Sequence, residues 1–133
     1  TDWHGELTTQ AALARFIHSG LLARHIRGVT REYALRYARV VEGLKQRCAR
    51  WLVPVPSAAG MHLAATLAPG ATVDLAHAVA RAGAAGVAVR RLADFSFGAP
   101  VVDGLVLGYG AIAGPRIDEG LSRLAAALAA VER

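Results

Sequence analysis

A long amphipathic pattern constrains this sequence more than any other feature. Between residues 21 and 48, apolar or aromatic side chains recur every three or four positions, at Leu22, Ile26, Val29, Tyr33, Tyr37, Val40, Leu44 and Cys48. This spacing is typical of one face of an α-helix, and Arg24, Arg27, Arg31 and Arg39 lie off that face. At 1.5 Å per residue the helix is about 40 Å long. We therefore expect it to lie across something large and to border a neighbouring domain.

Two shorter helices are predicted on either side of the first strands. Thr8 and Thr9 are candidate N-caps of a helix that Gly20 closes in the left-handed conformation. After a Pro-Gly break, Thr72 is the candidate cap of a second short helix, which ends near residues 83–86. Both helices are expected to be short.

Four segments have the composition of β-strands. The first two, separated by a turn at residues 57–60, indicate a hairpin or a close relative of one. The last two are separated by an irregular loop, Asp94 to Pro100, of the kind that lines binding sites. The predicted strands are Trp51–Val55, Met61–Leu67, Val87–Leu92 and Gly104–Tyr109.

A closing helix completes the order of elements. Pro115 suits its first turn, Asp118 and Glu119 would place negative charge there, and its apolar stripe runs on to Val131. The order predicts an α/β fold of the α+β type. It is a two-layer sandwich with a long N-terminal helix, in which helices cover a small mixed or antiparallel sheet.

Composition restricts the chain to one folded domain over residues 1–133. With 54% hydrophobic and 19% charged residues, it is neither disordered nor of low complexity. Cys48 is the only cysteine, so it forms no intrachain disulfide, and a reducing, cytoplasmic setting is the default expectation. No apolar run approaches the roughly 20 residues of a membrane span, so no membrane partner is expected.

The basic charge does not by itself predict nucleic-acid binding. The net charge is +5, the isoelectric point is near 10.3, and 14 of the 15 basic residues are arginine. A biased amino-acid usage and a solvated helix face between Arg24 and Arg50 account for this balance. The arginines are not interleaved with exposed aromatics, as single-strand binding would require.

No catalytic or metal-binding cluster stands out. His18 and His25 are separated by Gly20 and have no carboxylate at ligand spacing. Cys48 falls on the apolar stripe, which favours a buried, inert thiol, and Ser57 and Ser96 lack a nucleophile-elbow context. We assign no catalytic and no metal-binding residue.

Several segments, in order, resemble the C-terminal small domain of fold-type I aminotransferases, which depend on pyridoxal 5'-phosphate. The resemblance is greatest to the MocR branch of the GntR-type transcriptional regulators, and it covers nearly the whole chain. The segments are Gln10–Gly20, Leu22–Arg27, Pro54–Leu63, Gly86–Arg90, Gly104–Ile112 and Ile117–Leu121.

The resemblance implies that cofactor chemistry resides outside this chain. Such proteins use a lysine to form a Schiff base with the cofactor. The only lysine is Lys45, which lies within the long helix and is interpreted as a solvated residue. The cofactor lysine, its acidic partner and the phosphate site would then lie in a missing upstream large domain. We expect the chain to bind no cofactor and to catalyse nothing alone.

The resemblance also indicates which residues would line the substrate cleft. They are Phe95, Tyr109 and Val106, together with the segment Asp2 to Glu6 and the loop Asp94 to Pro100. Phe95 and Tyr109 have an alternative role as core aromatics. Val106 occupies a position where many active aminotransferases carry an arginine for the substrate carboxylate, and an apolar side chain cannot make that bidentate bond.

Our hypothesis is a cytoplasmic, homodimeric regulator in which this domain closes the cofactor or effector site, with DNA bound only through a missing N-terminal domain. Whether the parent protein turns over amino acids stays open. One alternative is the small domain of a metabolic class I/II aminotransferase. A second is a free-standing interaction domain unrelated to the cofactor.

Overall fold

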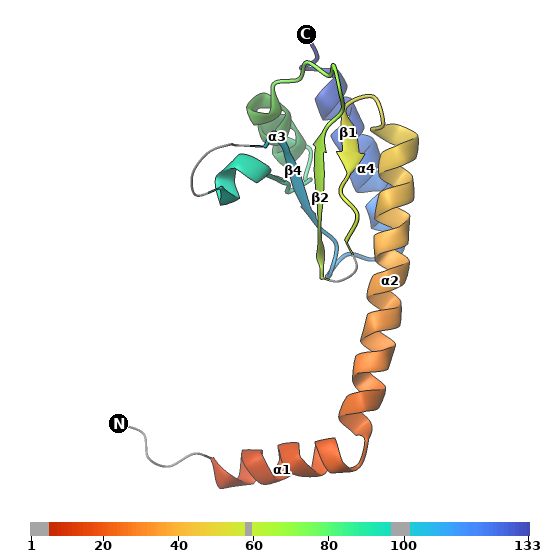
Figure 1. Cartoon of the computed structure of the whole chain (residues 1–133), viewed down its shortest axis with the longest axis vertical. Helices are drawn as coiled ribbons and strands as arrows, with labels where there is room; N and C mark the ends of the chain where they lie inside the picture. Colours follow the sequence, from red (N-terminus) through yellow and green to blue (C-terminus); the bar gives the residue numbers. More distant parts are fainter. Residues whose placement is uncertain (1–5, 58–59, 97–101) are drawn as a thin grey trace, which may run out of the picture. The chain divides into compact units, whose positions relative to one another are not determined.

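The computed structural model describes residues 6–57, 60–96 and 102–133, and the chain falls into two compact units, residues 1–34 and 35–133. The first unit contains α1 (Leu7–His18) and the start of α2 (Leu21–Arg47). The second contains the end of α2 and every strand (Figure 1).

The break between the first two helices lies where the sequence predicts it. Gly20 has a φ of +74°, the left-handed conformation that glycine adopts without steric cost. The predicted caps are wrong, because α1 begins at Leu7 and therefore includes Thr8 and Thr9. The Thr9 hydroxyl donates instead to the carboxylate of Glu6, at 2.6 Å.

The long helix is confirmed, and its two halves differ in burial. α2 ends one residue before Cys48. Its buried residues are Val40, Gly43 and Leu44, all in the second unit, and Cys48 behind them is also buried. None of the α1 residues is buried.

The second unit is a sheet with helices on one face, as the sequence predicts. Its strand order is β1-β2-β4-β3 with every pairing antiparallel, and the predicted hairpin is β1 and β2. Helices α3 and α4 and the end of α2 cover one face (Figure 1). The remaining elements are β1 (Leu52–Pro54), β2 (His62–Leu67), α3 (Leu75–Ala84), β3 (Arg90–Arg91), β4 (Gly104–Gly108) and α4 (Gly114–Ala129).

The third predicted strand, Val87–Leu92, is mostly not a strand. Only Arg90 and Arg91 pair with β4, opposite Val106 and Leu105. The chain then turns into η1 (Leu92–Phe95), a 3₁₀ helix. Val89 is buried without belonging to a strand, so its apolar character reflects packing rather than pairing.

The cap of α3 is Asp74, not the predicted Thr72. One Asp74 carboxylate oxygen accepts the backbone N–H groups of Ala76 and His77, both at 3.1 Å. The Thr72 hydroxyl donates to the Arg133 carbonyl at 2.8 Å and so holds the C-terminus. Asp74 precedes the first helical residue directly, which is the position that N-capping requires.

The acidic first turn predicted for α4 is also wrong. The helix begins at Gly114 with Pro115 in its first turn, as expected, but Asp118 and Glu119 lie beyond that turn. Asp118 accepts a hydrogen bond from Arg39 Nε at 2.9 Å. Its charge therefore serves a contact between α2 and α4 rather than the helix terminus.

The core lies between the helix layer and the covered face of the sheet. The predicted solvated face of α2 is confirmed, since Arg24, Arg27, Arg31, Arg39 and Arg50 are exposed, and two arginines at the end of that face also contact residues on or after α4. Arg47 Nε donates to the Ser122 hydroxyl at 3.2 Å, and Arg50 Nε lies 2.7 Å from a Glu132 carboxylate oxygen. The fully buried large side chains are Leu44, Leu52, Leu63, Leu105, Leu124 and Leu128.

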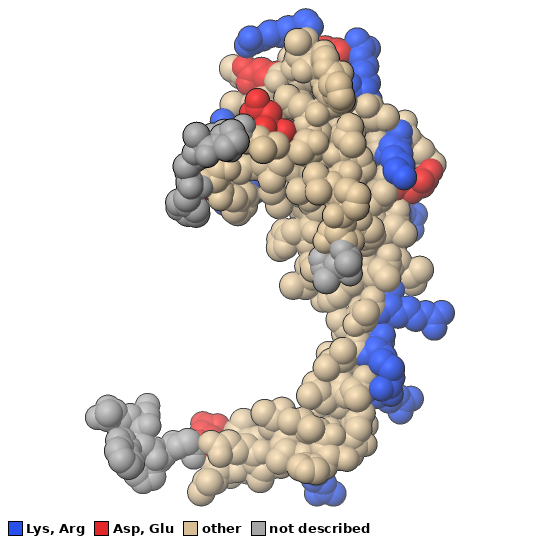
Figure 2. All heavy atoms as spheres, viewed as in Figure 1, with Lys and Arg blue, Asp and Glu red and all other residues tan. Residues whose placement is uncertain are grey.

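Basic side chains on the face drawn in Figure 2 are dispersed rather than gathered in one patch. This distribution gives no support to a nucleic-acid surface on that face. Among the residues that the structure describes, no helix is long and apolar enough to cross a membrane.

Candidate functional site

The sheet face opposite the α-helices is the candidate site, and we call it the open face. Side chains alternate between the two faces of a strand. On β4, Leu105 and Leu107 are buried against the helices, which directs Val106 to the open face. The same alternation and the register assign seven more residues to this face: Val53, His62, Ala64, Thr66, Arg90, Gly104 and Gly108.

Val106 lies at the centre of the open face. It is half-buried, with Ala64 opposite it on β2 and Arg90 opposite it on β3. The surface of the open face at this point therefore consists of small apolar side chains. The positive charge beside it belongs to Arg90 on the neighbouring strand. Position 106 itself offers no donor to a carboxylate.

Arg90 connects Val106 to Phe95. Its guanidinium carbon lies 5.2 Å from the centroid of the Phe95 ring, within the range of a cation–π contact. Its Nε lies 3.6 Å from a carboxylate oxygen of Asp94. Phe95 is 52% exposed, so it is not a core aromatic. The guanidinium and the ring both remain accessible to a ligand on this face.

Asp94 is shared by two arginines. Besides Arg90, it accepts a hydrogen bond from Arg91 Nη2 at 2.9 Å. Partial burial raises the pKa of Asp94, but the hydrogen bond and charge of Arg91 and the charge of Arg90 outweigh it and leave the pKa below its usual value. Asp94 is therefore ionised at neutral pH.

Two glycines let neighbouring groups approach the ends of the open face. A Cβ at Gly104 would lie 2.3 Å from the Ala65 carbonyl oxygen and 2.6 Å from a Leu92 methyl carbon. A Cβ at Gly108 would lie 3.3 Å from the His62 ring. Gly104 therefore admits η1 against β4, and Gly108 gives the imidazole a flat surface.

Tyr109 belongs to the other side of the sheet. It is 3% exposed, its hydroxyl donates to the Gly60 carbonyl at 2.8 Å, and its ring centroid lies 6.1 Å from that of Tyr37. Burial, and secondarily Tyr37, raise the pKa of Tyr109. Tyr109 thus holds Gly60, two residues before β2, in agreement with its alternative role as a core aromatic.

The structure brings two of the three predicted cleft residues together. Phe95 and Val106 both neighbour Arg90, whereas Tyr109 is separated from them by the alternation of β4. The predicted segment Asp2 to Glu6 falls outside the described residues except for Glu6, as does the loop Asp94 to Pro100 beyond Ser96. Sequence reasoning missed Arg90, because its place opposite Val106 follows from strand pairing and not from its neighbours along the chain.

The single lysine and single cysteine lie away from the open face. Lys45 is exposed on α2, as predicted. Cys48 is buried, and burial raises the pKa of its thiol to about 11, with a smaller opposing effect from Arg47. No group of three or more His, Cys, Asp or Glu side chains within the described ranges could hold a metal ion.

Three solved structures have the same fold as this chain. The multiple substrate aminotransferase of Thermococcus profundus aligns with a TM-score of 0.74 at 24% identity, covering 87% of this chain and 28% of its own. The kynurenine aminotransferase of Pyrococcus horikoshii aligns with a TM-score of 0.74 at 25% identity and the same coverage. LysN, the α-aminoadipate aminotransferase of Thermus thermophilus, gives a TM-score of 0.73 at 23% identity, covering 97% and 32%.

These matches define the class of the chain, which is a small domain of the aminotransferase type. No family model matches the sequence. A curated protein of Rhizobium meliloti, the probable rhizopine catabolism regulatory protein MocR, is 33% identical over 132 residues, which is 99% of this chain. The chain is accordingly a small aminotransferase-like domain of the MocR type. It spans only 26% of the length of that relative.

Proposed function

We propose that this chain is the C-terminal small domain of a transcriptional regulator that binds pyridoxal 5'-phosphate, where it closes the cofactor or effector site. The observation that carries the proposal is the 33% identity to MocR, which extends over almost every residue of the chain. An alignment of that length extends over a whole domain rather than a single motif. The fold shared with three aminotransferases supports the cofactor class.

The residues of this chain do not fit the task of holding the cofactor. A Schiff base needs a lysine amine in a protected site, whereas Lys45 is exposed on α2. The cofactor, which acts as an electron sink for bonds at the amine-bearing carbon of a substrate, would be held by the larger upstream part. We assign this chain the enclosing role.

The open face is the surface that we propose to face the effector. It combines a small apolar floor at Val106 and Ala64 with an accessible guanidinium and ring at Arg90 and Phe95. Closure of such a face over a ligand would exclude water and strengthen the charge of Arg90. Because position 106 carries no cation, retention of an anionic effector on this face would depend on Arg90.

Exposed apolar side chains in the first unit support a docking partner in the parent protein. They lie on α1 and the start of α2. A helix face that stays exposed to solvent normally carries polar residues instead. We propose that the upstream large domain covers them, that the parent is a cytoplasmic homodimer, and that DNA is bound by a separate N-terminal domain. The side chains are Leu7, Leu13, Phe16, Ile17, Leu21 and Ile26, each at least 37% exposed.

A metabolic aminotransferase is the second candidate, and the fold shared with three such enzymes favours it. The experiment that separates the two uses the full-length protein loaded with pyridoxal 5'-phosphate. Amino acids and amines are added, and the cofactor absorbance and the affinity for upstream DNA are followed together. A regulator changes DNA affinity without multiple turnovers. An enzyme converts amino donor and keto acid repeatedly and binds no specific DNA.

A further inference from the structure

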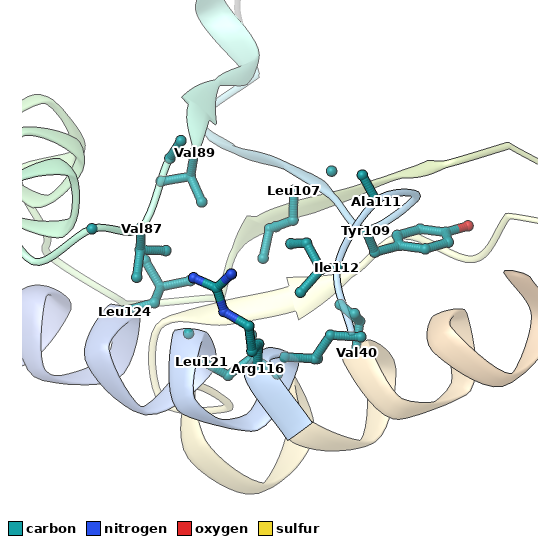
Figure 3. Close-up of a pocket in the computed structure, with 15 residues that line it drawn as sticks. Val40, Val87, Val89, Leu107, Tyr109, Ala111, Ile112, Arg116, Leu121 and Leu124 are labelled. Carbon is teal, nitrogen blue, oxygen red and sulfur yellow. The ribbon is translucent and has the colours of Figure 1, made fainter. Parts of the chain in front are cut away.

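A cavity on the helix side of the sheet belongs to none of the functions discussed so far. It has a volume of about 280 Å³ and lies between α4, the end of β4 and the segment that leads from α3 to β3. Figure 3 shows the apolar side chains that converge on it. They include Val87, Val89, Leu107, Ile112, Leu121 and Leu124.

The cavity also has one charged residue, Arg116. Its side chain extends from the start of α4 toward the apolar lining (Figure 3). Other charged side chains on α4 are engaged, since Asp118 pairs with Arg39 and Arg123 pairs with Glu119. Within the described residues, the Arg116 guanidinium has neither a hydrogen-bond acceptor nor a carboxylate partner. An unpaired guanidinium beside an apolar cavity is complementary to a carboxylate.

Gly120 keeps the cavity open on the α4 side. It lies one turn after Arg116 and lines the cavity, and a Cβ there would meet no atom within 4 Å. Glycine inside a helix costs stability relative to alanine. A cavity of about 150 Å³ holds benzene, so the present volume suits a ligand of roughly ten to twelve non-hydrogen atoms.

We propose that this cavity binds a small carboxylic acid with an apolar body. The body lies among the valine and leucine side chains, and the carboxylate pairs with Arg116. This site does not depend on the proposed function, because its lining side chains Val89, Leu107 and Leu121 face the core rather than the open face. A ligand bound here would contact both α4 and the segment that precedes β3.

The first test measures binding of octanoate to the 133-residue chain by amide chemical-shift changes in NMR titrations. We expect saturable changes at residues 86–89 and 116–124. Octanol, which lacks the charge, should bind about tenfold more weakly, because a charge-assisted hydrogen bond is lost. Octylammonium should bind more weakly still. Equal affinity for all three probes would overturn the role of Arg116.

Matched variants test the location. Gly120→Leu should fill the cavity and abolish octanoate binding, whereas Gly83→Leu is its control, since a Cβ at Gly83 on α3 also meets no atom within 4 Å and Gly83 is no part of the cavity lining. Arg116→Gln should weaken octanoate about tenfold and leave octanol unchanged, with Arg81→Gln as control. Unchanged octanoate binding by a folded Gly120→Leu variant would overturn the proposal. So would the absence of saturable octanoate binding to the unsubstituted 133-residue chain.

Discussion

Arg39 on α2 and Asp118 on α4 form an ion pair in which Arg39 Nε donates to Asp118 Oδ2 at 2.9 Å. The hydrogen bond from Arg39, opposed by partial burial and assisted by the charges of Arg39 and Arg47, holds the pKa of Asp118 below its usual value. The pair fixes the end of the long helix against the closing helix.

The pH dependence of this pair has a defined sign. A carboxylate with a lowered folded pKa stabilises the fold above its unfolded pKa, about 3.9, and loses that contribution as the pH falls through the folded value. Asp118→Asn should therefore be less stable than the parent at pH 7, and the difference should vanish in acid. Urea unfolding from pH 7 to pH 2 measures it. A difference that persists at pH 2 would contradict the assignment.

The carboxylate of Asp74 should stabilise the fold by capping α3. Hydrogen bonds from the His77 backbone and side chain, together with the charges of His77 and Arg133, lower its pKa to about 2 despite partial burial. We expect Asp74→Ala to lower the Tm at pH 7 and Asp74→Asn to lower it less, because asparagine also caps helices. The Tm loss should disappear as the pH falls from about 4 through 2. Equal losses for Asn and Ala would argue against capping.

Cys48 should be unreactive in the folded chain. Burial raises the pKa of its thiol to about 11, and the thiolate is the reactive form. At pH 8 we expect a disulfide reagent to modify it on the order of a hundredfold more slowly than an unfolded control. The raised pKa also means that stability falls as the pH rises above the unfolded value of about 8.5. Rapid labelling under native conditions would place Cys48 outside the core.

The burial difference along α2 predicts two unequal leucine substitutions. Leu44 is fully buried, whereas Leu35, nine residues earlier on the same helix, is 62% exposed. Leu44→Ala should cost about 2–5 kcal/mol of unfolding free energy through lost burial and a cavity. Leu35→Ala should stay within about 0.5 kcal/mol of the parent. Chemical denaturation of both variants measures the difference, and similar costs would contradict the described burial.

The elements with strong periodicity or unique conformational demands were predictable from sequence. The stripe from Leu22 to Cys48 predicted α2 to within a residue at each end, because only a helix places those side chains on one face. Gly20 was predictable for a different reason, since a left-handed link between two helices favours glycine. The closing helix followed from Pro115 and its leucines.

Features set by tertiary partners were not predictable. Val87 to Leu92 has strand composition, yet only Arg90 and Arg91 find partners on β4. Thr72 and Asp74 are both competent caps, and the position of Leu75 relative to the core decides between them. Arg90 belongs to the candidate site because strand register places it opposite Val106. This pairing cannot be read from the spacing of residues along the chain. The open face is likewise a property of the sheet as a whole.

Substitution of Arg90 tests whether the open face binds the effector. In the full-length protein, Arg90→Gln should weaken binding of an anionic effector about tenfold through loss of a charge-assisted bond. Arg81→Gln, at an exposed arginine on α3, serves as the control. Isothermal titration with the effector measures both variants. Equal affinities in the parent and Arg90→Gln proteins would remove Arg90 from the site.

We propose that this domain encloses a cofactor site whose reactive amine lies elsewhere in a longer protein. The most direct measurement loads the full-length protein with pyridoxal 5'-phosphate, reduces it with borohydride and maps the pyridoxyl-modified peptide by mass spectrometry. We expect stoichiometric modification of a lysine outside these 133 residues, with Lys45 unmodified. Stoichiometric modification of Lys45 would contradict it.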